Sequence, residues 1–109
     1  AWGASEFVTE KAPRTAVGAF PNGSVVLFVV DGVEDDAEGL DLYELAEVLL
    51  GLGVSHAVNL DGGGSSVAVA EGGQVISKPS CWNRAEVCER DVASIACLRH
   101  PPAGVALNP

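Results

Sequence analysis

The chain has 109 residues, of which 48% are hydrophobic, and its formal net charge is −9. A chain of this length and apolar content can bury one core, which excludes an intrinsically disordered protein. The negative charge argues against nucleic-acid binding, because that function requires a basic surface. No apolar run reaches the roughly 18 residues that a membrane-spanning helix needs, so none is predicted.

Two β-rich runs come first in the chain, Arg14–Phe20 and Ser24–Val30. The sequence Pro-Asn-Gly lies between them, and this combination predicts a β-hairpin. The second run is almost entirely apolar, which predicts a strand buried on both faces of a sheet. It ends at Asp31-Gly32, a dipeptide typical of turns.

One amphipathic helix is predicted over residues 41–53. Asp41 can cap its start, and Glu44 three residues later would complete a capping box. Gly51 and Gly53 offer stops. The apolar residues recur at the spacing that places them on one helix face: Leu42, Leu45, Ala46, Leu49 and Leu52.

A short strand is predicted over residues 54–60, directly after the helix. The order strand, helix, strand implies a crossover within one sheet. Residues 66–77 predict a hairpin that turns at Gly72-Gly73, and residues 91–98 predict a final buried strand. The sequence therefore predicts an α+β fold with a mixed β-sheet and one main amphipathic helix.

The segment Asn59–Ser66 reads NLDGGGSS and follows the third predicted strand. Backbone N–H groups of consecutive glycines can form a nest that binds anions, and serine adds a hydroxyl donor. A Walker A loop is excluded because no lysine follows the glycines, and the spacing does not fit a dinucleotide-binding loop. A flexible tight turn would explain the same letters, so both interpretations stay open. The candidate anion-binding residues are Gly62, Gly63, Gly64 and Ser65.

Two arginines and two aspartates are candidates for the same site. Arg14 and Arg90 each begin a predicted strand. A guanidinium group binds phosphate through a planar fork, although a surface ion pair would also explain either residue. Asp61 and Asp31 each follow a predicted strand, at the carboxyl ends where ligand sites gather. Glycoside hydrolysis usually requires two carboxylates, one as acid and one as base or nucleophile. Asp31 could equally be present only because it forms a turn with Gly32.

No cluster of His, Cys, Asp or Glu has the spacing of metal ligands, so the sequence predicts neither a metal nor another cofactor. There are three cysteines, Cys81, Cys88 and Cys97. An odd number indicates that one thiol is free or has its partner outside this sequence.

The chain resembles the phosphodiester glycosidase domain in five segments that follow one another in the same order. These segments are APRTAVG, VVLFVVDG, GLDLYELAEVLLGLGVSHAVNLDGGGSSVAV, VISKPS and CERDVASIACL. The resemblance implies a hydrolase acting on a sugar-1-phosphodiester carried by a glycan or glycoprotein. In animal-type members, N-acetylglucosamine is removed from a phosphodiester to mannose, which exposes mannose 6-phosphate.

With this resemblance, we expect Arg14 and Arg90 to hold the phosphate together with the Gly62–Ser65 backbone. Asp61 is the first candidate for the catalytic carboxylate and Asp31 the second. Two alternatives remain: a sugar-phosphate binding module without catalysis, and a bacterial-type glycan phosphodiester glycosidase.

The cysteine spacing is similar to that of animal-type members of the family. This implies a Cys81–Cys88 disulfide, an upstream partner for Cys97 and a location in the secretory pathway. It also implies that residues 1–99 form the C-terminal half of a larger phosphodiester glycosidase domain. Residues 100–109 are expected to be a tail or linker.

Overall fold

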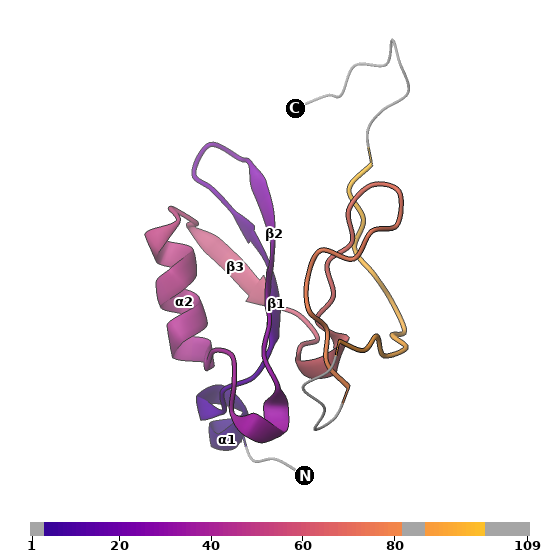
Figure 1. Ribbon diagram of the computed structural model, residues 1–109. Coiled ribbons are helices and arrows are strands. Elements are labelled where there is room, and N and C mark those ends of the chain that lie inside the picture. Colours follow the sequence, from indigo (N-terminus) through magenta and orange to yellow (C-terminus); the bar gives the residue numbers. More distant parts are fainter. Residues whose placement is uncertain (1–3, 82–86, 100–109) are drawn as a thin grey trace.

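The computed structural model describes residues 4–81 and 87–99 of the chain (Figure 1). Three strands, one main helix and a shorter one confirm the predicted α+β class. The predicted tail lies outside the described residues. In chain order the elements are α1 (Ala4–Thr9), β1 (Arg14–Ala19), β2 (Val25–Val30), the 3₁₀ helix η1 (Glu34–Asp36), α2 (Leu42–Gly51), β3 (His56–Asn59) and the 3₁₀ helix η2 (Gly63–Ser65).

The sheet has the strand order β2–β1–β3, and both outer strands run antiparallel to β1. The described sheet is therefore antiparallel and not mixed as predicted, because the helix crossover leads to the far side of β1 and not to a strand beside β2. The predicted hairpin is confirmed, with Arg14 opposite Val30. β3 pairs with the other side of β1 and places Asn59 opposite Ala16. Because β2 and β3 run in the same direction, their carboxyl ends and the start of β1 share one end of the sheet. We call this end the Arg14 edge.

The predicted helix is confirmed as α2, including its capping box. The Asp41 carboxylate accepts a hydrogen bond from the Glu44 backbone N–H at 2.7 Å, and the Asp41 N–H donates to the Glu44 carboxylate at 3.1 Å. α2 packs on one face of the sheet (Figure 1). The fully buried core between them consists of Ala16, Leu45, Leu49 and Val54.

The prediction that residues 24–30 are buried on both faces of the sheet is wrong. Val26 and Phe28 pack against the core, but Val25 is 62% exposed and Leu27 is 40% exposed. β2 lies at the edge of the sheet, and α2 covers one face only. The opposite face of β2 therefore keeps its apolar side chains at the surface of the described structure.

The predicted strand over residues 91–98 is also wrong. Residues 91–99 form no strand, and Ile95 and Leu98 are 77% and 82% exposed. No strand edge of the described sheet pairs with this apolar run, so its apolar composition alone does not make it a strand. The predicted hairpin at Gly72-Gly73 is reduced to a tight turn with a single bridge between Val69 and Val75.

Among the helices in the described part of the chain, none has the length and apolar character that crossing a membrane would require.

Candidate functional site

The Arg14 edge brings together the ends of all three strands. Asp31 follows β2, Asp61 follows β3, and Arg14 begins β1. The segment after β3 is fastened to β1 by backbone hydrogen bonds, from Leu60 N–H to the Thr15 carbonyl at 2.7 Å and from Gly63 N–H to the Pro13 carbonyl at 2.8 Å. The topology therefore places the start of β1 and the segments after β2 and β3 at the same end of the sheet.

Arg14 is a buried residue, only 2% exposed, and its described partners are backbone carbonyls. Its Nε donates to Leu40 O at 3.0 Å, and its Nη2 donates to Glu10 O at 2.6 Å and Phe7 O at 3.1 Å. The guanidinium also lies 5.1 Å from the centre of the Phe7 ring. In this arrangement Arg14 joins α1, β1 and the segment before α2.

Burial lowers the pKa of the Arg14 guanidinium, and the nearby carboxylates of Glu10, Asp41 and Glu34 act in the opposite direction. Arginine nevertheless stays protonated in proteins, so the side chain remains a cation. Its charge is thus surrounded by carbonyl oxygens and carboxylates of the chain itself.

The Gly62–Gly64 tract is required by close packing. Gly63 has φ +57°, which glycine adopts without strain, and a Cβ there would collide with the Glu34 carboxylate. A Cβ at Gly64 would lie 2.6 Å from the Ser80 carbonyl. A side chain at Gly64 would therefore push the Ser80 backbone away from the loop, whereas one at Gly63 would displace the Glu34 carboxylate and strain the backbone.

The backbone N–H groups of this loop already donate hydrogen bonds within the chain. The Gly64 N–H donates to Glu34 Oε1 at 3.0 Å, while Ser65 and Ser66 donate to the carbonyls of Gly62 and Gly63. The carboxylate of Glu34 thus occupies a donor of the predicted anion nest. A phosphate that uses the Gly64 N–H would have to displace this carboxylate.

Arg90 lies against the same loop. Its Nη2 donates to the Ser65 hydroxyl at 2.9 Å, and its guanidinium carbon is 3.2 Å from the position of a Cβ on Gly64. The structure therefore brings together two elements that the sequence analysis paired, one arginine and the glycine loop. Arg90 is half-buried, so its charge is nearer the surface than that of Arg14.

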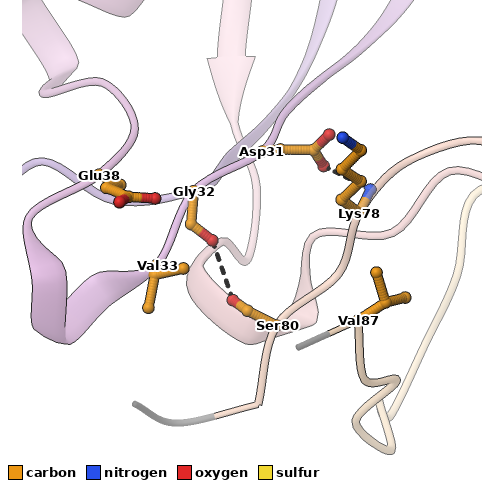
Figure 2. Close-up of a pocket in the computed structure, with 7 residues that line it drawn as sticks. All are labelled: Asp31, Gly32, Val33, Glu38, Lys78, Ser80 and Val87. Carbon is orange, nitrogen blue, oxygen red and sulfur yellow. Dashed lines mark hydrogen bonds between the residues drawn. The ribbon is translucent and has the colours of Figure 1, made fainter. Parts of the chain in front are cut away.

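Asp31 borders a separate hollow of about 230 Å³ (Figure 2). Its carboxylate accepts a hydrogen bond from the Lys78 backbone N–H at 2.8 Å, and the Ser80 hydroxyl donates to the Gly32 carbonyl at 3.0 Å. Asp61 is exposed and does not line this hollow. The two aspartates share the Arg14 edge, but no described contact joins them.

Three residues at this edge were not predicted as part of the site: Glu34, Lys78 and Ser80. Glu34 belongs to an acidic segment that the sequence marks only as a polar loop. Its contact with Gly64 spans 30 positions and has no periodic signature. The nearby Ser66 is 1% exposed, and its hydroxyl has no hydrogen-bond partner. Residues 4–81 and 87–99 contain no group of three or more His, Cys, Asp or Glu placed to hold a metal ion.

The implied disulfide between Cys81 and Cys88 is present, with Cα atoms 5.4 Å apart. It lies one residue beyond Ser80 and two residues before Arg90, so it links the two segments that pack on Gly64. Cys97 is a free, exposed thiol, and no upstream partner is shown for it.

Comparison with known proteins identifies a single family. A family model described as phosphodiester glycosidase matches residues 2–99. The human N-acetylglucosamine-1-phosphodiester alpha-N-acetylglucosaminidase is 40% identical over 99 residues, which are 89% of this chain and 19% of the human protein. A prophage-derived uncharacterized protein of Bacillus subtilis, YomE, is 39% identical over 62 residues, covering 57% of this chain and 10% of its own.

A solved structure agrees with these sequence matches. It is the catalytic domain of the zebrafish N-acetylglucosamine-1-phosphodiester alpha-N-acetylglucosaminidase, described as auto-inhibited by its pro-peptide. The TM-score is 0.72 at 39% identity, over 81% of this chain and 29% of the zebrafish chain. The chain thus spans about a fifth of the length of the human relative that it matches.

Proposed function

Because the chain belongs to the phosphodiester glycosidase family, we propose that it takes part in hydrolysis of a sugar-1-phosphodiester. The proposed substrate is a glycan or glycoprotein in which N-acetylglucosamine is joined through phosphate to mannose. Its hydrolysis would release the N-acetylglucosamine and leave mannose 6-phosphate. The names of the human and zebrafish relatives support this choice of sugar and linkage.

The observation that carries the proposal is the contact of Arg90 with the glycine loop, next to Asp61. A half-buried guanidinium that bonds the Ser65 hydroxyl at 2.9 Å supplies a cation and a hydroxyl at one point. These groups suit the single negative charge of a phosphodiester. Asp61 directly precedes the glycine loop in the chain, and its carboxylate is exposed. It can therefore reach a sugar whose phosphate is bound at the loop.

The chemistry divides between these residues. Cleavage of the bond between the anomeric carbon and oxygen builds positive charge on the sugar ring, which a carboxylate stabilises. We assign that role to Asp61, with Asp31 as the second candidate. The phosphate is a good leaving group and needs charge stabilisation more than protonation. We assign its binding to Arg90, the Ser65 hydroxyl and the Gly62–Ser65 segment apart from the Gly64 N–H, which Glu34 occupies. We assign Arg14 mainly a supporting role, because its hydrogen bonds join β1 to α1 and to the segment before α2.

Replacement of Asp61 tests the proposal. Asp61→Asn in the intact protein should reduce turnover of a GlcNAc-phospho-mannoside by at least about a hundredfold, the scale of losing one catalytic carboxylate. Glu71→Gln, a charge change at an exposed position on the tight turn, is the matched control and should leave turnover unchanged. Turnover retained in Asp61→Asn with an unaltered circular dichroism spectrum would refute the assignment.

Two alternatives have their own tests. A binding module without catalysis would bind the phosphodiester but release no N-acetylglucosamine in any assay. A bacterial-type enzyme would prefer a cell-wall or exopolysaccharide phosphodiester over the mannoside.

The Cys81–Cys88 disulfide favours a secretory-pathway protein, because such bonds persist in oxidising compartments. We also propose that Cys97 pairs with an upstream cysteine there, which mass spectrometry of the non-reduced protein would detect.

A further inference from the structure

Glu34 is the carboxylate in closest contact with the glycine loop. It comes from η1, on the segment between β2 and α2, and reaches across 30 positions to the Gly64 N–H at 3.0 Å. Its carboxylate also fills the space that a side chain on Gly63 would need. A negative charge of the chain itself therefore lies against the loop to which the proposed function assigns the substrate phosphate.

The charges around the loop are nearly balanced before any ligand binds. Arg90 contributes one positive charge against Gly64 and Ser65, while Glu34 contributes one negative charge at the same residues. Arg14 is buried among backbone carbonyls, and the carboxylates near it already include Glu34. Asp61 adds a further negative charge at the start of the loop. Each additional negative charge on a ligand therefore meets repulsion that the described cations do not fully offset.

We propose that Glu34 is a specificity-determining residue that makes the site favour a phosphodiester over a phosphomonoester. A phosphodiester carries one negative charge, whereas a phosphomonoester carries about 1.5 to 2 at neutral pH. Coulomb repulsion grows in proportion to ligand charge, so the Glu34 carboxylate penalises the monoester about twice as much. This inference rests on the proposed function, since the monoester is the product of that reaction. Repulsion by Glu34 would thus speed product release and limit product inhibition.

The test compares two ligands that the proposed reaction cannot cleave. Mannose 6-phosphate is the monoester, and mannose 6-(methyl phosphate) is a diester without a glycosidic phosphate bond. Their dissociation constants are measured by calorimetry at pH 7.5 for the intact protein and for Glu34→Gln. Glutamine keeps the shape of the side chain and an oxygen that can accept from Gly64, so the substitution removes mainly the charge.

Glu34→Gln should tighten binding of the diester by about threefold and of the monoester by about ninefold. These values follow from Coulomb's law for unit charges about 6 Å apart in a water-like dielectric, and they change the ligand preference by about threefold. Asp35→Asn is the matched control, because it removes the same charge from the same 3₁₀ helix at an exposed neighbouring position. It should change the preference by less than about 1.5-fold.

Four results would overturn the inference. If Asp35→Asn changed the ligand preference as much as Glu34→Gln, the preference would depend on the total negative charge of the segment and not on the Glu34 contact. Equal tightening of both ligands would show that charge repulsion does not set the preference. Weaker binding in Glu34→Gln would assign Glu34 a supporting role only, and no binding of either ligand to either protein would show that the loop does not take a mannose phosphate. Turnover of the GlcNAc-phospho-mannoside is measured in parallel; its presence keeps the proposed function whatever the preference, and its absence refutes that function separately.

Discussion

The two halves of the described chain are held together in different ways. The sheet unit, residues 4–59, has paired strands, a capped helix and a buried apolar core (Figure 1). The loop segment, residues 60–81 and 87–99, has no strand in this described part, where it is held by single hydrogen bonds, one isolated bridge and one disulfide. Residues 91–99 of the loop segment are all exposed.

The candidate site lies where these two regions meet. The sheet unit supplies the rigid strand ends, whereas the loop segment supplies Asp61, the glycine loop and Arg90. Changes in the sheet unit should therefore act first on global stability. Changes in the loop segment should act first on local order and on ligand binding.

The largest expected loss of stability follows Arg14→Ala in the sheet unit. The substitution leaves the carbonyls of Phe7, Glu10 and Leu40 without their buried donor. Hydrogen bonds to charged groups contribute about 1.5–3 kcal/mol each, but not additively, so we expect a loss of about 3 kcal/mol in the free energy of unfolding. Urea unfolding measures it, with the exposed Arg99→Ala as control. Equal midpoints for the two variants would contradict the structural role of Arg14.

Removal of the disulfide should affect the loop segment and spare the sheet unit. The bridge closes a loop of sequence separation 7, for which the chain-entropy relation gives about 2 kcal/mol. The Cys88 N–H donates to Pro79 O at 2.8 Å in the parent protein, and exchange of the amide at this position should accelerate in the variant with Cys81→Ser and Cys88→Ser. Exchange at Val17 in β1 should stay slow. Equal acceleration at both amides would mean that the two regions unfold as one unit.

Loss of the helix cap should have a smaller effect that is confined to the sheet unit. Asp41→Ala removes the side-chain acceptor for the Glu44 N–H at the start of α2. N-cap replacements of this kind cost about 1 kcal/mol. The thermal midpoint should fall accordingly, while Asp36→Ala at an exposed position should leave it unchanged. A larger fall in Asp36→Ala would argue against the capping role of Asp41.

The smallest effect concerns the pH dependence of stability at Glu10. Burial raises the pKa of the Glu10 carboxyl in the folded state, and the charge of Glu34 adds to the rise. The folded state then binds this proton more tightly than the unfolded state. Stability is therefore lost as pH rises from the unfolded value of about 4.3 through the folded pKa.

Glu10→Gln should remove this loss. Between pH 4 and pH 7 the free energy of unfolding of the variant should therefore rise slightly relative to that of the parent protein. Urea midpoints across that range measure the difference, and Glu47→Gln at an exposed position of α2 serves as a control for net charge. A variant that loses stability relative to the parent as pH rises would reverse the predicted sign.

Local sequence signals predicted most of the sheet unit. Pro-Asn-Gly specified the β1–β2 hairpin, and the Asp41–Glu44 pair specified the start of α2. The errors arose where burial depends on distant partners. The apolar run at residues 91–98 has strand composition, yet no described strand edge receives it. Likewise, an apolar β2 does not reveal that only one of its faces meets a helix.

The sequence placed the candidate residues at one end of the sheet but not their contacts. Strand direction alone predicts that Asp31 and Asp61 lie at the same end of the sheet, because each follows a strand that runs antiparallel to β1. It does not predict that Arg14 is enclosed by carbonyls or that Glu34 reaches Gly64. Such contacts depend on how irregular segments fold back, which has no periodic pattern in the sequence.

The position of β1 between β2 and β3 has a consequence for the order of folding. The β1–β2 pairing joins neighbours in the chain, whereas the β1–β3 pairing brings Ala16 to Asn59 and must wait for the intervening helix. Closing the longer loop costs more chain entropy, so β3 is expected to join late. The glycine loop follows β3 directly. A chain trapped before that step would keep a folded hairpin yet have no assembled candidate site, so assembly of the site depends on completion of the fold.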